Sequence, residues 1–227
     1  MTRDQYLQSV KEIMINKNPY GAYHKQNFDN YSSYGEMAPI NKDIINNMPN
    51  GQIIISEEVY EMLLAVQDVT IEQNKEIPFF LYGKEIGNNT IEFNEFISSS
   101  DNRQNNAASF NKEMINNLEN KLKDNLNKHF VVCHGHSHPP IGDLHQNFSL
   151  GDFASYMQMN EDNQVFKTRQ AELMGCLVTS TGDINFVFYD NINKNFYRFT
   201  NVFIKNKNND YIQINNYGLN QTSNSVR

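Results

Sequence analysis

The sequence feature that most constrains the fold is an apolar run followed at once by closely spaced histidines. Residues 130–133 read Phe-Val-Val-Cys, and the next five read His-Gly-His-Ser-His before Pro139. A short apolar run of this kind, bounded by a turn signal, is typical of a buried strand. Alternate residues of a strand lie on one face, so His136 and His138 would point toward one place. Because proline has no N–H to donate, it would end the strand's ladder. We therefore predict a buried strand at 130–136.

A serine and an aspartate three residues apart open the next helical segment. Ser149 and Asp152 would share one face of the first turn, although Ser-x-x-Asp is also a common helix-capping pattern. Four histidines within a dozen residues, two of them flanking Ser137, are hard to explain as unrelated surface or core residues. Two imidazoles and one carboxylate make an open zinc site with a fourth position for water. We therefore predict a zinc site formed by His136, His138 and Asp152.

These residues carry a resemblance to a known family. The sequence His136-Ser137-His138-Pro139, followed by Ser149-x-x-Asp152, is similar to the signature of the JAB/MPN (JAMM) zinc metallopeptidases. That family also uses a glutamate at the start of a buried strand that leads into a glycine. Residues 76–83, Glu-Ile-Pro-Phe-Phe-Leu-Tyr-Gly, resemble that segment, with Glu76 in the matching place. The resemblance covers residues 51–200, and the stretch between Pro139 and Ser149 is longer than is usual in the family.

The resemblance implies a set of catalytic roles. Zinc would lower the pKa of its water toward about 7, which suits attack on an amide carbonyl. Glu76 would take the proton of that water and pass it to the leaving amine, and a desolvated carboxylate can have its pKa raised for such work. Ser149 would donate a hydrogen bond to the oxyanion. Without the resemblance, Glu72 and Glu85 compete with Glu76 for the role of the proton carrier.

Three further residues near the motif need interpretation. His134 lies two residues before His136, so it would face the same site and contact either the ligands or the substrate. The pair of His134 with His136 has equivalent strand geometry, and only the family register, fixed by the proline, favours the later pair. Asp143 and His145 fall in the lengthened loop, where we expect solvated side chains.

The composition narrows the class of partner and the location. The 227 residues carry a net charge of −7, so no basic face is expected to bind nucleic acid. No apolar run approaches the ~20 residues of a membrane span, and the N-terminus lacks the apolar core of a signal peptide. We therefore expect a cytoplasmic protein, and the family resemblance implies that it acts on a protein or peptide. The cysteines, Cys133 and Cys176, are expected to be buried free thiols. Pairing Cys133 with His134 as nucleophile and base is disfavoured, because adjacent strand residues face opposite ways.

The periodicity along the chain predicts an α+β fold with a mostly antiparallel sheet flanked by helices. This order agrees with the JAB/MPN fold and its cytidine-deaminase-like layout, which the resemblance implies. We divide the chain into an N-terminal extension at 1–50, a JAB/MPN-like metallopeptidase domain at 51–205 and a polar C-terminal tail at 206–227. Helices are predicted at 2–16, 56–72, 109–126 and 149–159, and strands at 52–55, 78–82, 90–96, 130–136, 173–180, 183–189 and 196–204. A tyrosine-rich loop is expected at 17–42.

Two functions follow from the sequence. The first is a zinc-dependent peptidase or isopeptidase that hydrolyses an amide bond. The family implies that this bond lies at the C-terminal tail of a ubiquitin-like or sulfur-carrier-like protein. The alternative is a non-catalytic MPN-type interaction module that binds zinc. Family members of that second kind usually lack the ligands, whereas this chain retains Glu76, both histidines, Ser149 and Asp152, so the hydrolase is favoured.

Overall fold

The structure is a computed structural model that describes residues 46–98, 116–117, 120–121, 123–124, 130–140, 147–162, 166, 171–190, 192–193 and 195–215. Several predictions from the sequence lie outside these residues. They are the helix at 2–16, the tyrosine-rich loop at 17–42, and the loop residues Asp143 and His145. The described residues of the predicted helix at 109–126 are helical.

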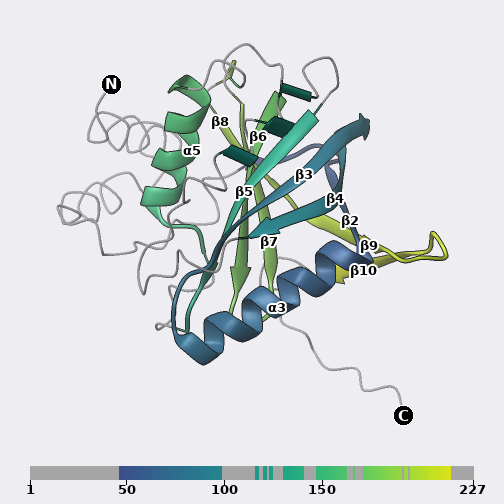
Figure 1. Ribbon diagram of the computed structural model, residues 1–227. Helices are drawn as coiled ribbons and strands as arrows, with labels where there is room; N and C mark the ends of the chain where they lie inside the picture. The colour runs from purple at the N-terminus through teal and green to yellow at the C-terminus, as the bar shows by residue number, and fades with distance from the viewer. Residues whose placement is uncertain are drawn as a thin grey trace.

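The described strands form a single ten-stranded sheet in the order β1-β8-β7-β6-β5-β3-β4-β2-β9-β10. Two helices, α3 (Glu57–Gln73) and α5 (Leu150–Asp162), lie on different sides of it (Figure 1). The strands are β1 (Asn46–Asn47), β2 (Gln52–Ser56), β3 (Pro78–Gly87), β4 (Thr90–Ser98), β5 (Phe130–His138), β6 (Ala171–Thr179), β7 (Ile184–Asp190), β8 (Asn195–Phe199), β9 (Asn201–Lys205) and β10 (Tyr211–Asn215).

The predicted α+β class fits this architecture, but the sheet is mixed rather than mostly antiparallel. Four of its nine strand pairings are parallel: β1 with β8, β2 with β4, β2 with β9, and β5 with β6. The other five are antiparallel. Neighbouring parallel strands need a long crossover connection. The segment that carries α5 supplies one between β5 and β6, and α3 with β3 supplies another between β2 and β4.

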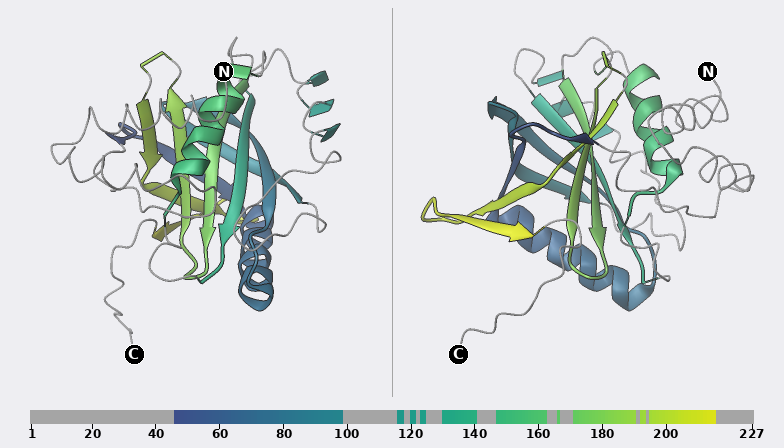
Figure 2. Two further views of the ribbon diagram at one scale, coloured as in Figure 1. Left: turned by 90° about the vertical axis from the view of Figure 1, so that its left-hand side faces the viewer. Right: turned by 180° about the vertical axis from the view of Figure 1, so that it is seen from behind.

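The predicted single strand at 196–204 is wrong, because the chain forms two strands there. β8 pairs with β7, whereas β9 pairs with β2 near the other end of the sheet order. The core residues Phe199 and Val202 are three positions apart, which a strand of period two cannot bury on one face. The chain therefore turns a corner at Thr200, and the sheet is curled (Figure 2).

Both ends of the sheet order include strands that the sequence did not predict. β1 lies within the range assigned to the N-terminal extension and pairs with β8. β10 lies within the range assigned to a polar tail and forms a hairpin with β9. The hairpin projects from the body of the sheet (Figure 2). Within the part of the chain that the structure describes, no helix is both long enough and apolar enough to cross a membrane.

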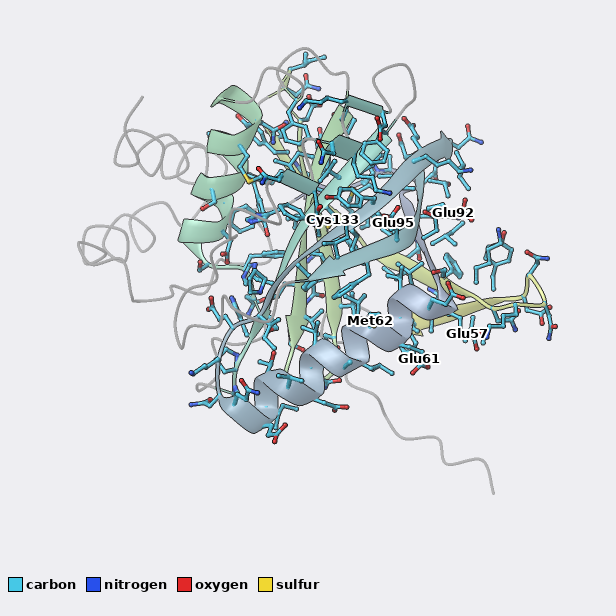
Figure 3. The ribbon with its side chains drawn as sticks, viewed as in Figure 1. Glu57, Glu61, Met62, Glu92, Glu95 and Cys133 are labelled. Carbon is cyan, nitrogen blue, oxygen red and sulfur yellow. The ribbon has the colours of Figure 1, made fainter. Side chains whose placement is uncertain are left out.

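Helix α3 packs on one face of the sheet and matches its prediction closely. The Ser56 hydroxyl caps it by accepting from the Val59 N–H at 3.2 Å, and Asn74 ends it in the left-handed region with φ 50°. Val59, Leu63 and Val66 belong to the main apolar cluster, together with residues of the eight strands β2 to β9 and with Ile77, which precedes β3. The three- and four-residue spacing of the apolar residues would place Met62 in the same buried stripe, but Met62 is 45% exposed (Figure 3).

The opposite face of the sheet carries a second apolar cluster and helix α5. Phe80, Tyr82 and Val132 belong to this cluster. Helix α5 approaches β6 closely at Gly175, where a Cβ atom would lie 2.4 Å from the ring of Tyr156. Only glycine leaves room for this contact, so Gly175 fixes how near the helix comes to the strand beside β5.

Candidate metal centre

The side chains of strand β5 alternate between the two faces of the sheet, as the sequence predicts. Val131 and Cys133 belong to the cluster that packs on α3, whereas Phe130 and Val132 belong to the cluster on the opposite face. The histidines continue the second series, because alternate residues of a strand share a face. β5 runs to His138, two residues beyond the predicted end, and Pro139 follows it.

The carboxylate of Asp152 reaches the same place from the first turn of α5. The Ser149 N–H donates to Asp152 Oδ2 at 2.6 Å, and the Asp152 N–H donates to Ser149 Oγ at 3.2 Å. This reciprocal pair is a capping box, so the capping interpretation of Ser-x-x-Asp is correct. It also restricts the rotamer of Asp152, because one carboxylate oxygen is held by the backbone.

Ring contacts reinforce this start of the helix. Phe148, one residue before the cap, packs edge-on against Phe153 with the ring centroids 5.7 Å apart. An apolar contact between these two positions is a hydrophobic staple, which fixes the angle at which the chain enters the helix. Phe148 also contacts the ring of His136 edge-on at 6.3 Å. We did not identify Phe148 from the sequence, although the staple spacing around Ser149 is a signal that could have shown it.

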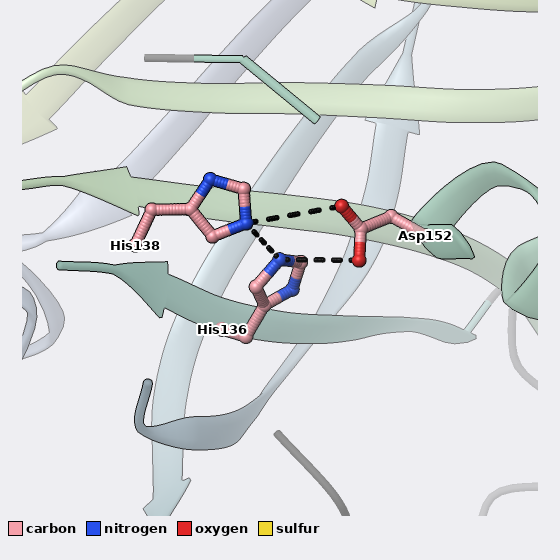
Figure 4. Close-up of side chains that lie close together, drawn as sticks. All are labelled: His136, His138 and Asp152. Atoms are coloured by element: carbon pink, nitrogen blue, oxygen red, sulfur yellow. Dashed lines mark hydrogen bonds and ion pairs between the residues drawn. The ribbon is translucent and has the colours of Figure 1, made fainter. Parts of the chain in front are cut away.

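The predicted ligands converge (Figure 4). His136 Nε2 lies 3.0 Å from His138 Nε2 and 3.3 Å from Asp152 Oδ1, and His138 Nε2 lies 3.9 Å from Asp152 Oδ2. Atoms bound tetrahedrally at about 2.0–2.1 Å from one zinc ion are themselves about 3.3 Å apart. The observed separations bracket that value. Among the described residues, this is the group of three whose ligand atoms could hold a metal ion.

The electrostatics of the group favour a positive charge at its centre. Burial tends to lower the pKa of His136, but the charge of Asp152, its hydrogen bond and the charge of Glu76 outweigh burial and raise that pKa. Burial likewise tends to raise the pKa of Asp152, but His136, His138 and the Ser149 N–H together hold it well below its usual range. Two facing Nε2 atoms 3.0 Å apart also need a hydrogen or a cation between their lone pairs.

Glu76 lies beside the group but outside it. The residue is 4% exposed, and its Oε1 atom lies 3.9 Å from His138 Nε2. The competing glutamates, Glu72 and Glu85, are both exposed to solvent. The structure therefore separates the three candidates, because only Glu76 has its carboxylate at the metal group.

His134 shares the face of the ligands but has other contacts. Its ring meets Tyr156 edge-on at 5.6 Å and Phe80 at 5.8 Å. Burial, followed by the charge of His136, lowers its pKa well below the usual value, so the ring is neutral. The group that could hold a metal contains His138 and not His134, which argues against the alternative ligand pair.

Comparison of the chain with protein-family models and with curated proteins gives no match. The geometry of the metal group and the motif residues are therefore the observations that bear on function.

Proposed function

We propose that the protein is a zinc-dependent peptidase or isopeptidase that hydrolyses an amide bond. The position of Glu76 carries this proposal: a buried carboxylate lies 3.9 Å from the ligand His138 and is not itself one of the three ligands. A structural zinc site is closed by four protein ligands, whereas catalytic sites use three and keep one position open. The described residues supply three.

His136, His138 and Asp152 would hold the metal. Two imidazoles and one carboxylate are a donor set that zinc accepts in hydrolases, and their separations fit its tetrahedral geometry. Bound there, zinc would supply Lewis acidity, which acidifies water and polarises a carbonyl.

Two side chains of the protein would complete the reaction. Glu76 would accept a proton from the attacking water and deliver it to the leaving amine, since its carboxylate lies 3.9 Å from His138 Nε2 and is not one of the three proposed ligands. Ser149 would donate its hydroxyl hydrogen to the developing oxyanion. The Ser149 oxygen is an acceptor in the helix cap, so the cap does not use that hydrogen.

The substrate class and the finer fold assignment rest on the motif. Its resemblance to the JAB/MPN metallopeptidases supports a JAB/MPN-like layout within the α+β fold. It also supports a substrate in which the scissile amide follows the C-terminal tail of a ubiquitin-like or sulfur-carrier-like protein. The acidic net charge of −7 agrees with a protein or peptide partner and not with nucleic acid.

The test compares two variants with one matched control. Glu76→Gln keeps the size of the side chain but cannot carry a proton, so it should retain zinc and lose about 10²–10⁴ in cleavage rate. His138→Ala should lose both zinc and cleavage, because a three-ligand site cannot spare a ligand. Glu72→Gln changes an exposed glutamate nearby and should behave as the parent. Zinc content and cleavage of a fusion bearing a carrier-protein tail are the two measurements.

The outcomes also separate the alternative function. If Glu76→Gln cleaves as fast as the parent, Glu76 is not the proton carrier. If the parent holds zinc but cleaves neither the tail fusion nor a diverse peptide pool, the non-catalytic MPN-type module that binds zinc replaces the hydrolase.

A further inference from the structure

A chain of buried hydrogen bonds lies behind the metal group, on the α3 side of β5. Its centre is Ser137, which stands between the two ligand histidines and is fully buried, as is Thr70 in the last turns of α3. The two hydroxyl oxygens are 2.5 Å apart. Thr70 also donates to the Val66 carbonyl at 2.7 Å, and the Ile77 N–H donates to Ser137 Oγ at 2.9 Å.

The direction of each hydrogen bond in this chain can be assigned. Thr70 gives its one hydroxyl hydrogen to the Val66 carbonyl, so Thr70 Oγ1 must accept from Ser137. Ser137 accepts from the Ile77 N–H and donates its own hydrogen to Thr70. The order is therefore Ile77 to Ser137 to Thr70 to Val66, and every hydrogen in it is used once.

This chain holds the backbone next to Glu76. The Ser137 N–H donates to the Ile77 carbonyl at 3.2 Å, in addition to the bond that Ser137 Oγ accepts from the Ile77 N–H. Ser137 thus makes hydrogen bonds with both the N–H and the carbonyl of Ile77, the residue that follows Glu76. The neighbours of Ser137 on β5 are ligands, so one short network fixes the proton carrier relative to the metal group.

We propose that Thr70 is a positioning residue for Glu76, acting through Ser137 and the Ile77 backbone. This inference rests on the proposed function for the role of Glu76. Without the Thr70 oxygen, the buried Ser137 hydroxyl has lost its acceptor and must turn to another one, because an unpaired buried hydroxyl is unfavourable. Turning it releases the Ile77 N–H, and the Glu76 carboxylate loses its fixed distance from His138.

The test uses Thr70→Val, Thr70→Ser and a packing control. Valine has the shape of threonine without the hydroxyl, and serine restores the hydroxyl. Val59→Ala is the control, because the Val59 side chain is buried in the apolar cluster at the end of the same helix remote from Thr70, and alanine keeps the N–H that donates to Ser56. Three quantities are measured on the full chain: kcat and KM of the zinc-loaded protein, thermal stability, and hydrogen exchange of the Ile77 amide in the metal-free protein.

For Thr70→Val we expect kcat to fall about 10-fold with KM unchanged, since small displacements of a catalytic group reduce rate steeply. Exchange of the Ile77 amide should rise about 10-fold, which corresponds to the loss of one hydrogen bond. Thr70→Ser should restore both quantities. Val59→Ala should lower the melting temperature without reducing kcat and without a comparable rise in Ile77 exchange.

Two results would overturn the positioning role. One is a Thr70→Val protein whose kcat and Ile77 exchange equal those of the parent. The other is a Val59→Ala protein in which kcat falls and Ile77 exchange rises as much as in Thr70→Val, which would make the effect one of general stability. If the parent itself hydrolyses nothing, the proposed function fails. The Ile77 exchange of the metal-free variants then decides by itself whether Thr70 fixes the Glu76 segment.

Discussion

The two faces of strand β5 differ in how their polar groups are satisfied. On the α3 face, Ser137 is the polar residue of the strand, and protein donors and acceptors satisfy it completely. On the other face, His136 and His138 meet each other and the carboxylate of Asp152. The polar group on the α3 face is thus fully hydrogen-bonded within the protein, whereas the imidazole and carboxylate groups on the other face are arranged so that a cation could bind between them.

This difference shows why a single strand can serve both stability and chemistry. Because alternate residues point in opposite directions, each histidine of the metal group is followed or preceded by a residue anchored in the core. Cys133 and Ser137 lie in that interior at 0% exposure. Substitutions on the α3 face should therefore change stability, while substitutions on the α5 face should change metal binding.

The largest effect is expected at the ligand carboxylate. Asp152→Asn keeps an oxygen that can accept from the Ser149 N–H, so helix α5 remains capped, but the negative charge is lost. We expect zinc affinity to fall by more than about 100-fold. Removing a residue that only hydrogen-bonds to a metal ligand already lowers metal affinity by about 10–100-fold, and Asp152 is proposed to bind the metal itself. Asp68→Asn, on the exposed side of α3, is the matched control. Competition titration with a chelating indicator measures both, and unchanged affinity in Asp152→Asn would remove this residue from the ligand set.

The next effect concerns how α5 is held against the sheet. Gly175→Ala would place a Cβ atom 2.4 Å from the Tyr156 ring, so the helix must move outward. Overpacking of this kind costs about 1–3 kcal/mol. Because α5 carries Asp152, zinc affinity should fall together with stability in denaturant unfolding. A variant that loses stability but binds zinc as the parent does would show that the ligand position does not depend on this contact.

A dependence on pH follows for the metal-free protein. Burial lowers the pKa of His136, but the charge and hydrogen bond of Asp152 outweigh burial and raise the pKa above its usual value of 6.5. Its charged pair with Asp152 therefore adds stability fully below that usual value, and this stability is lost as the pH rises through the raised pKa. The melting temperature of chelator-treated protein should fall as the pH rises through this pKa. Zinc affinity should increase over the same pH range, because an imidazole must be neutral to bind the metal. Asp152→Asn should flatten the stability profile, and an equally steep profile in that variant would contradict the assignment.

The smallest effect is expected on the α3 face. Cys133→Ala removes one buried sulfur atom from the interior, which is comparable to deleting a methylene group and should cost about 1 kcal/mol. Zinc affinity should equal that of the parent within error. If Cys133→Ala weakens zinc binding as strongly as Gly175→Ala does, the two faces of β5 are not independent.

Local patterns allowed part of this structure to be predicted. Ser56 and the apolar spacing that follows it predict helix α3, and the Ser149–Asp152 spacing predicts the start of α5, because caps and periodicity act within a few residues. The alternation along β5 likewise predicts which histidines share a face. The three residues that could hold a metal ion were therefore named before their contacts were known.

Long-range pairing could not be predicted in the same way. The parallel partners of β2 and β5, and the separation of β8 from β9, depend on contacts between segments far apart in the chain. Glu76 was chosen over Glu72 and Glu85 through the family resemblance alone, because the burial that separates the three glutamates in the structure cannot be read from the sequence. The bond between Thr70 and Ser137 joins residues 67 positions apart, and no local pattern marks it.

The most direct test of the central claim is a zinc titration of chelator-treated protein by calorimetry, in the parent and in His138→Ala. We expect the folded parent to take up one zinc ion per chain and His138→Ala to take up none at the same concentrations. A folded parent that does not bind zinc would contradict the proposed metal site, and so would a His138→Ala variant that binds zinc as tightly as the parent.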